Sequence, residues 1–574
     1  MKRIHLLKLS SELLLILLIA TGCGSNTNQY DVPIATDTAS IAKGQILFSQ
    51  HCSSCHNFRQ DGIGPHLAGI TDSVHISWII DFIKTPKALI DDGDLRALEL
   101  HAKYKTVMPD FKSFTDEEME SLIAFMHSRE KEGGPDKKID PGAITNPVPD
   151  SLTYSGIEIN LEVIAQIPAS ATKPPLARIV KMDIQPGTGK TFILDLRGKL
   201  YQLKDRGVAV YFDMAQWKSK FIHQPGLATG FGSFEFHPEF IKNGLFFTTH
   251  TEPAGSGIAD FGFDDSIKVR LQWIVTEWKA EQPAANTFTG TGRELFRVNM
   301  LSQLHGMQDI EFNPYAKKGD EDYGELYIGV GDGGSVENGH PELVHRADRI
   351  WGTVLRINPT GNNGRKSRYG ISAANPFAGK KDNSLPEVYA YGFRNPNRIT
   401  WTHSGMMLVT NIGQAQLESI YQVVKGGDHG WPLREGTFEL HPDNNLTNVY
   451  ALSKDVEHER QPGFIDPVAQ YDHDEGQAIA GGYEYTGLAL PQLKNKYLFG
   501  DIVSGRLFFT DVTGLQPGKP AEIKEWKVSI NGKSVTLREL TGIKRVDLRF
   551  GRDAKGEMYL FTKADGKVYK LVKK

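Results

Sequence analysis

Residues 309–330 read DIEFNPYAKKGDEDYGELYIGV, a polar segment with glycines between two short runs that are rich in large apolar residues. Such residues at alternating positions are typical of a β-strand with one buried face. The middle of the stretch contains Asn, Pro, Gly and Asp, which are turn-forming residues. The stretch therefore predicts a β-hairpin.

The same pattern occurs six times between residue 155 and the end of the chain. Units of about 70 residues suit the four-stranded blades of a β-propeller, whose radial arrangement leaves only short edges. We therefore predict an all-β six-bladed propeller over residues 155–574, with long loops as places for functional sites. The other copies are IVKMDIQPGTGKTFIL (179–194), SFEFHPEFIKNGLFFTTH (233–250), RITWTHSGMMLVTN (398–411), YEYTGLALPQLKNKYLFGDI (483–502) and VDLRFGRDAKGEMYLFT (546–562).

The segment before the propeller has a different pattern. In ISWIIDFIKTPKALI and DEEMESLIAFMHS the apolar residues recur at helical spacing, which predicts a small all-α domain over residues 40–130. Residues 131–154 are rich in charge, Gly and Pro, which predicts a linker. The chain is therefore expected to be multidomain, with a helical domain followed by the propeller.

Within the helical domain, residues 51–56 read HCSSCH, and the chain has only three cysteines. A structural zinc site needs four ligands, and no second Cys or His pair follows. A thioredoxin-type CxxC begins a helix in a βαβ unit, whereas this one follows the helical run GQILFSQ. C-x-x-C-H is the anchor of a c-type haem, with Cys52 and Cys55 as thioether links and His56 as an axial iron ligand.

The second axial ligand is predicted to be Met108, because Pro109 holds an extended turn from which a thioether can point inward. A core methionine is the alternative for Met108. GQILFSQHCSSCH followed by MPDF resembles the pattern of class I cytochromes c over residues 40–130. The resemblance implies His/Met ligation, which raises the haem potential relative to His/His and suits an electron acceptor.

The first 23 residues combine a basic start with an apolar stretch, LLLILLIA, that is shorter than the roughly 20 residues of a membrane span. This predicts a secretory signal peptide. Its end, IATGC, resembles a bacterial lipobox, so Cys23 is expected to carry the lipid and residues 24–39 to form a tether. Cleavage nearby by ordinary signal peptidase is the alternative. We expect an exported lipoprotein, anchored to a membrane on its periplasmic side.

The amino-acid composition argues against nucleic acid as a partner. The 65 Lys and Arg residues nearly balance the 69 Asp and Glu residues, so there is no electrostatic case for nucleic acid binding. The 58 glycines and 29 prolines point to many turns, which favours β structure over helical bundles.

Several phrases in the propeller occur in a recognisable order over residues 304–509: LHGMQDIEFNP, ELYIGVGDGGS, YGFRNPNRITW, NIGQAQLESIYQVVKGGDHGWP and GRLFF. As an ordered set they resemble the glucose/sorbosone dehydrogenase family, six-bladed propellers that bind pyrroloquinoline quinone (PQQ). The resemblance covers most of residues 225–574. It implies a PQQ-dependent oxidoreductase that acts on an aldose sugar or a related alcohol or aldehyde.

The resemblance assigns two catalytic residues. In the family a histidine removes the proton of the sugar hydroxyl while hydride passes to the quinone, and His305 occupies its position. Arg394 occupies the arginine of the family's G-x-R-N-P phrase, where a guanidinium would stabilise the quinone oxygen. A buried structural histidine and an arginine that braces a blade are the alternatives.

The resemblance also implies cofactor-binding residues. Asn395 lies beside Arg394, and Gln414 lies in a loop that in relatives lines the quinone and offers carbonyl oxygens to calcium. Lys544 and Arg545 stand where glucose dehydrogenases have an R-x-R-D phrase. We therefore expect PQQ and calcium as cofactors besides the haem.

The chain departs from the family pattern at several positions. Met307 and Gln308 replace two glycines after the base, which is expected to narrow the quinone site. Thr486 and Val546 stand where glucose dehydrogenases have cations. PQQ carries three carboxylates, so these losses are expected to weaken its binding. GDGG at 331–334 is predicted to be a blade turn, because no helix with the phosphate-loop signature follows.

Together these features predict an exported quinohaemoprotein that oxidises a sugar or alcohol, reduces its own c-type haem and passes electrons to a respiratory acceptor. The alternative is a carbohydrate-binding propeller that is non-catalytic or uses another cofactor, tethered to an electron-transfer cytochrome c.

Overall fold

The computed structural model describes residues 33–573, except 54, 59–60, 62–63, 105–106, 130–141, 206, 226–227, 415, 443–444 and 454–462. The predicted signal peptide, Cys23 and most of the predicted tether lie outside the described residues, so lipidation and export stay predictions. Among the helices in the described part of the chain, none is both long and apolar enough to span a bilayer.

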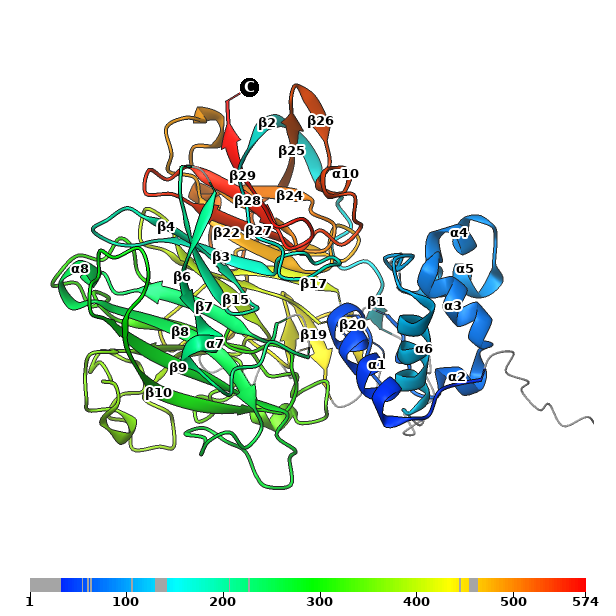
Figure 1. Ribbon diagram of the computed structural model, residues 1–574, viewed down its shortest axis with the longest axis horizontal. Helices are drawn as coiled ribbons and strands as arrows, with labels where there is room; N and C mark the ends of the chain where they lie inside the picture. Colours follow the sequence, from blue (N-terminus) through cyan, green and yellow to red (C-terminus); the bar gives the residue numbers. More distant parts are fainter. Residues whose placement is uncertain are drawn as a thin grey trace, which may run out of the picture.

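The N-terminal domain is helical, as predicted, and lies to one side of a large β domain (Figure 1). Helices α1 and α6 pack against each other, and Phe48, Leu122 and Phe125 lie in their shared core. Gly44 makes this contact possible, because a Cβ there would lie 1.8 Å from the Ser121 carbonyl oxygen. The helices are α1 (Thr38–His51), α2 (Ile70–Ser73), α3 (Ile76–Lys84), α4 (Pro86–Asp91), α5 (Leu95–Tyr104) and α6 (Asp116–His127).

The β domain is a six-bladed propeller, which confirms the predicted fold. Each of the six predicted hairpins covers the first two strands of one blade. In chain order the first three blades are β3 (Ile179–Ile184), β4 (Thr191–Asp195), β5 (Lys199–Leu203) and β6 (Val208–Asp213); β7 (Phe231–Phe236), β8 (Leu245–Pro253), β9 (Leu271–Ala280) and β10 (Gly290–Met300); and β11 (Asp309–Phe312), β12 (Leu326–Val330), β13 (Thr353–Ile357) and β14 (Val388–Tyr391).

Of the remaining three blades, the fifth is built from consecutive strands, whereas the fourth and the sixth each contain one strand from far away in the sequence. The three blades are β15 (Pro396–Trp401), β16 (Met407–Asn411), β17 (Leu417–Gln422) and β21 (Ala469–Asp472); β22 (Ile479–Glu484), β23 (Lys496–Asp501), β24 (Leu507–Asp511) and β25 (Lys524–Ile530), with β26 (Lys533–Val535) at its edge; and β27 (Leu548–Arg552), β28 (Met558–Thr562), β29 (Lys567–Val572) and β2 (Thr153–Gln166). Strand β2 pairs antiparallel with β29 and parallel with β25, so the start of the propeller closes its last blade.

Two features correct the predicted boundaries. The propeller begins at Thr153, inside the predicted linker. Strand β1 (Ala143–Ile144) also lies in that linker and joins a small sheet outside the blades, with β18 (Arg434–Glu435), β19 (Phe438–His441) and β20 (Asn445–Tyr450). For the described part of the predicted linker, residues 142–154, the composition was therefore a poor guide to structure, because β1 and β2 pair with distant strands. Short helices α7 (Met214–Trp217), α8 (Phe240–Asn243) and α10 (Leu537–Thr541) lie in propeller loops.

The six inner strands contact one another in a ring, in the order β3, β7, β11, β15, β22, β27 and back to β3. A fully buried carboxylate, Asp309 at the start of β11, links four of them. Its Oδ1 lies 2.9 Å from Nη1 of Arg398 in β15 and 3.3 Å from Nζ of Lys181 in β3, and it accepts the hydroxyl of Ser233 in β7. Its Oδ2 accepts the backbone N–H of Ile399.

These contacts join residues near the beginning of each strand, so the inner strands start at one common end of the propeller axis. We call this end the rim; it is formed by the residues that precede the inner strands, around positions 178, 230, 308, 395, 478 and 547. Residues that are far apart in the sequence therefore meet at the rim.

The substitution Asp309→Ala is expected to lower the free energy of unfolding of the propeller by about 3–5 kcal/mol, because it removes one partner from a buried ion-pair network. Urea unfolding followed by far-UV circular dichroism measures this. The matched control is Asp511→Ala, since Asp511 is 57% exposed in its pair with Lys496 and such pairs are worth about 0–1 kcal/mol. Equal effects of the two substitutions would contradict the proposed importance of Asp309.

Candidate active site and haem site

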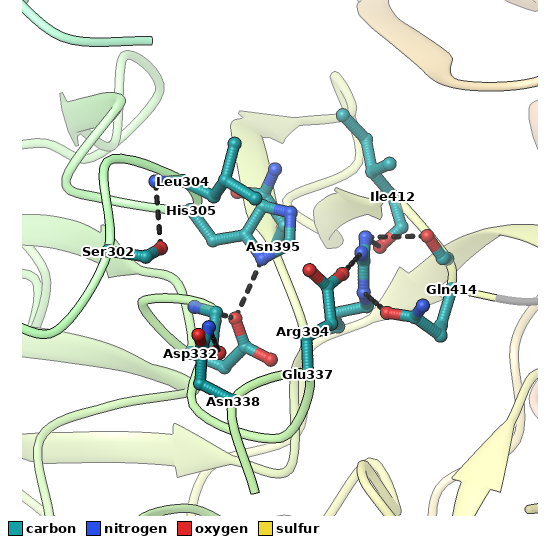
Figure 2. A network of polar contacts seen from close by, with 12 residues as sticks. Ser302, Leu304, His305, Asp332, Glu337, Asn338, Arg394, Asn395, Ile412 and Gln414 are labelled. Atoms are coloured by element: carbon teal, nitrogen blue, oxygen red, sulfur yellow. Dashed lines mark hydrogen bonds and ion pairs between the residues drawn. The ribbon is translucent and has the colours of Figure 1, made fainter. Parts of the chain in front are cut away.

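His305 and Asp332 form a buried pair at the rim (Figure 2). The His305 Nδ1 lies 2.7 Å from Oδ1 of Asp332. An ionised carboxylate only accepts hydrogen bonds, so Nδ1 carries the proton and donates it. Nε2, which has no hydrogen-bond partner among the described residues, is thereby left with its lone pair, and the adjacent carboxylate would stabilise the imidazolium.

Both carboxylate oxygens of Asp332 accept further hydrogen bonds. Its Oδ1 also accepts the backbone N–H of Gly334, and its Oδ2 accepts the indole N–H of Trp431 at 3.1 Å. Asp332 lies in the GDGG phrase that follows β12, so this phrase does more than make a blade turn. Sequence reasoning missed this residue; the available signal was a single carboxylate among glycines at the end of a buried strand.

The backbone at His305 has a left-handed conformation, with φ of 47°. This conformation is costly for a residue with a Cβ and persists where the surroundings enforce it. The surroundings are tight, because a Cβ on Gly331 would lie 2.3 Å from the His305 carbonyl oxygen and a Cβ on Gly306 would lie 2.1 Å from Nε1 of Trp273. The two glycines therefore leave the space that this conformation of His305 requires.

Arg394 lies beside this pair, and its carbonyl oxygen accepts the backbone N–H of Asp332. The guanidinium is buried and uses most of its donors within the chain: Nε to Gln414 Oε1 at 2.9 Å, Nη1 to the Gly413 carbonyl at 2.6 Å, and Nη2 to Glu337 Oε1 at 2.6 Å (Figure 2). Arg394 thus braces the loop after β16, as the alternative interpretation held, and Glu337 offsets part of its charge.

Asn395 and Gln414 are both buried at the rim. The side-chain Oδ1 of Asn395 has no hydrogen-bond partner in the described part of the chain, which is unfavourable for a buried polar atom unless a ligand or water supplies a donor. Gln414 instead uses its Oε1 on Arg394. Asn395 therefore fits a role in binding a cofactor with polar groups, and Gln414 has a structural role that the sequence did not indicate.

The described residues do not form a calcium site by themselves. No group of three or more His, Cys, Asp or Glu side chains in them is placed to hold a metal ion. The Gly413 carbonyl, one of the backbone oxygens of the predicted calcium loop, already accepts an Arg394 N–H. Calcium stays a prediction that would depend on backbone carbonyls and on the oxygens of the cofactor.

Two of the departures from the family pattern have a different meaning in the structure. Met307 is fully buried in the propeller core with Trp273 and Ile310, so it does not narrow the rim. Val546 is fully buried in another core with Leu507 and Leu537. An arginine at position 546 would therefore have to enter an apolar core, so the missing cation at this position is a feature of the local packing.

Cys52, Cys55 and His56 follow α1, as predicted. The two thiols form no disulfide, and burial raises the pKa of Cys52 to about 12, which argues against a redox-active CxxC. His56 Nδ1 lies 2.8 Å from the Pro65 carbonyl oxygen, and burial lowers the pKa of His56. A neutral imidazole that donates from Nδ1 leaves Nε2 for a metal ion, so the three residues fit a covalent haem.

Met108 lies in the loop between α5 and α6 and is half-buried. The backbone N–H of Phe111 donates to the Ile83 carbonyl at the end of α3, which fixes the loop against the domain. Met119 and Met126 are buried in the helical core, as their spacing indicated. The role of Met108 as iron ligand stays a prediction.

Lys544 and Arg545 face the helical domain. Lys544 Nζ lies 2.7 Å from Oδ2 of Asp110, two residues after Met108. Arg545 pairs with Asp547 at 3.1 Å, and its charge acts on the pKa of Cys52. The predicted cofactor-binding role of both residues is untested, but the structure shows them where the two domains meet.

Comparison with known proteins places both domains. Residues 180–570, more than half of the chain, match the sequence model of the glucose/sorbosone dehydrogenase family. Residues 41–130 match the model of cytochrome c. Both predicted resemblances are thereby confirmed.

Individual relatives are distant. The HIPL2 protein of Arabidopsis thaliana is 26% identical over 368 residues, which cover 56% of this chain and 50% of the relative. Quinoprotein glucose dehydrogenase B of Acinetobacter calcoaceticus is 23% identical over 218 residues, 35% of this chain and 40% of the relative. A solved glucose dehydrogenase structure, 17% identical, has a TM-score of 0.51 and covers 72% of this chain and 99% of its own, which is a likeness of fold.

The chain spans about half the length of the curated relatives it matches, which include Hedgehog-interacting proteins of mouse and human. Activity therefore does not follow from the relatives alone.

The double substitution Cys52→Ala/Cys55→Ala is expected to abolish covalent haem, whereas wild-type haem survives denaturation and acid-acetone extraction because thioether bonds are covalent. Met108→Ala is expected to keep the haem and lose the sulfur-to-iron absorption band. Extraction followed by visible spectroscopy measures both. Haem that resists extraction in the double variant, or an unchanged band in Met108→Ala, would contradict the respective assignment.

Proposed function

Because this chain belongs to the glucose/sorbosone dehydrogenase family and carries a cytochrome c domain, we propose that it is a quinohaemoprotein. It would oxidise an aldose sugar or a related alcohol or aldehyde with PQQ and pass the electrons to its own c-type haem. The observation that carries the proposal is the buried His305–Asp332 pair beside Arg394, at the same rim that the helical domain contacts.

His305 would act as the general base. Its Nε2 would take the proton of the substrate hydroxyl, and Asp332 would hold the ring and stabilise the positive charge that results. Bound PQQ would supply the acceptor for the two electrons that leave the substrate carbon as hydride. One proton and one hydride leave the alcohol, so the product is the carbonyl compound.

Arg394 and Asn395 would hold the quinone end of the cofactor. Its contacts with Gln414, Glu337, Gly413 and Ile412 occupy four of the five N–H groups of the Arg394 guanidinium, and the fifth has no partner among the described residues and would serve a ligand. One fixed donor with a partly balanced charge suits an oxygen that gains negative charge during the reaction. The Oδ1 of Asn395, which lacks a partner among the described residues, is an acceptor and would take a hydrogen bond from an N–H or O–H of the cofactor or the substrate.

Contacts between the domains support the haem as the internal electron acceptor. Gln303, two residues before His305, donates from Nε2 to Oγ of Ser49, three residues before Cys52, at 3.3 Å. Lys544 pairs with Asp110 in the Met108 loop, and Lys173 pairs with Glu118 in α6 at 2.7 Å. The residues that would hold the haem and the proposed base are thus brought to one interface.

The second candidate function is a binding propeller without this catalysis. It is favoured by the Hedgehog-interacting proteins among the relatives and by the extent to which Arg394 is used within the chain. Wild-type protein that binds no PQQ in the presence of calcium, and whose haem is reduced by no aldose or alcohol tested, would favour this function over the enzyme.

The substitutions His305→Ala and Asp332→Asn are expected to lower the rate of sugar-driven haem reduction by about 10²- to 10⁴-fold, because the first removes the base and the second disturbs its tautomer. Affinity for PQQ should change little in either variant, since both act on the substrate proton. Arg394→Ala should weaken PQQ binding and the rate together. Stopped-flow spectroscopy of the haem and calorimetric titration with PQQ separate these outcomes, and a rate within twofold of wild type in His305→Ala would refute the assigned base.

The charge reversal Lys544→Glu is expected to slow haem reduction by about two- to fivefold, because a partly exposed ion pair is worth up to about 1 kcal/mol. The double reversal Lys544→Glu/Asp110→Lys should restore the rate. PQQ affinity should remain that of wild type. A loss of PQQ affinity in the single variant that the double variant does not recover would instead assign Lys544 to the cofactor.

A further inference from the structure

Two lysines of this propeller, Lys181 and Lys563, are buried, and they differ in whether carboxylates contact their ammonium groups. Lys181 in β3 is almost fully buried, and its ammonium contacts three carboxylates: Glu311 at 2.8 Å, Glu235 at 3.1 Å and Asp309 at 3.3 Å. Such pairing is the usual condition for a charged group inside a protein. The second buried lysine, Lys563, has no carboxylate in ion-pair contact among the described residues.

Lys563 is 3% exposed and directly follows β28, whose last residue pairs with the first residue of β27. It therefore lies at the rim. Its backbone N–H donates to the Asp547 carbonyl, but its ammonium has neither a hydrogen-bond nor an ion-pair partner among the described residues. Burial, together with the charges of Arg549 and Arg178, lowers the pKa of Lys563 well below its ordinary value.

Arg549, the second residue of β27, adds to the same excess of charge. Its one hydrogen bond among the described residues goes from Nη1 to the carbonyl of the preceding residue, Leu548. Burial lowers the pKa of Arg549 to about 10. The carboxylate of Asp547 acts on both residues, but its ion pair is with Arg545. The single carboxylate of Asp547 thus acts on four cations, which are Arg178, Arg545, Arg549 and Lys563.

Burial without an ion-pair partner disfavours the charged form of Lys563, as its lowered pKa indicates, so an anion that binds at Lys563 and Arg549 would supply the counter-charge that stabilises the ammonium. Two cations, one a planar guanidinium with several N–H donors, suit a ligand with more than one carboxylate. His305, Arg394 and Asn395 lie at the same rim, at the starts of other inner strands.

We propose that Lys563 and Arg549 form the site for the carboxylates of the quinone cofactor, with its quinone end toward Arg394. This inference rests on the proposed function. It also resolves the missing cations, because Val546 is part of the apolar core and Lys544 pairs with Asp110. The positive charge that binds the cofactor comes from the second residue of β27 and the end of β28.

The test uses the full-length haem protein without quinone. Lys563→Met and Arg549→Met are each expected to raise the dissociation constant for PQQ by roughly 10- to 100-fold, since a hydrogen bond to a charged group is lost. Lys567→Met, on the neighbouring strand β29 where the side chain is 38% exposed, is the matched control and should bind PQQ like wild type. Isothermal titration calorimetry provides the constants.

A second readout distinguishes a binding role from a structural one. Removal of an unpaired buried charge should leave the melting temperature of the quinone-free Lys563→Met protein unchanged or raise it, whereas loss of a structural contact would lower it. Should Lys563→Met not fold, Lys563→Arg, which keeps the charge, must bind PQQ while Arg549→Met binds it weakly. PQQ affinity within twofold of wild type in both methionine variants would overturn the proposal.

A quinone-free probe separates this site from the proposed function. Benzene-1,3,5-tricarboxylate should raise the melting temperature of wild type and not that of Lys563→Met. If wild type binds this probe but not PQQ, the anion site stands and the quinone function fails. If the probe does not stabilise wild type and PQQ does not bind, the anion site is refuted as well.

Discussion

The buried carboxylate of Asp309 is the contact on which the arrangement of the site depends. It joins β11 to β15 through Arg398, to β3 through Lys181 and to β7 through Ser233, all near the beginning of these strands. In a low-dielectric interior such charge-assisted contacts are strong and directional. They align the starts of these four inner strands along the propeller axis, so the loops that precede the strands lie at the same rim.

The rim then assembles a site from residues of several blades. His305 precedes the third blade, Asp332 follows the second strand of that blade, and Arg394 precedes the fourth blade. Hydrogen bonds connect the three, because Asp332 holds the His305 ring and donates its backbone N–H to the Arg394 carbonyl. The helical domain contacts the loop of the base through Gln303 and Ser49, so the proposed oxidation and the proposed haem share one interface.

The distribution of buried charge distinguishes scaffold from site. Lys181 is neutralised by carboxylates from neighbouring inner strands and contributes to the fold. Among the described residues, the ammonium of Lys563, which is also buried, has no ion-pair partner, and Arg394 keeps one N–H donor after bracing its loop. An anionic ligand at the rim would supply the counter-charge that Lys563 lacks among the described residues, whereas Lys181 already has its carboxylates.

The hairpins and the haem anchor followed from the sequence alone, because a strand period and the CxxCH motif are local patterns. His305 and Arg394 were predicted as site residues from ordered phrases, and their roles stay predictions, whereas their hydrogen-bond partners could not be predicted from the sequence. Only the tertiary structure decided that β2 closes the last blade, that Asp332 holds His305, and that Lys563 is buried without an ion-pair partner among the described residues. The physical reason is that each of these features depends on groups that only folding brings together. A hydrogen bond or ion pair between residues far apart in the sequence produces no repeating pattern in the sequence itself.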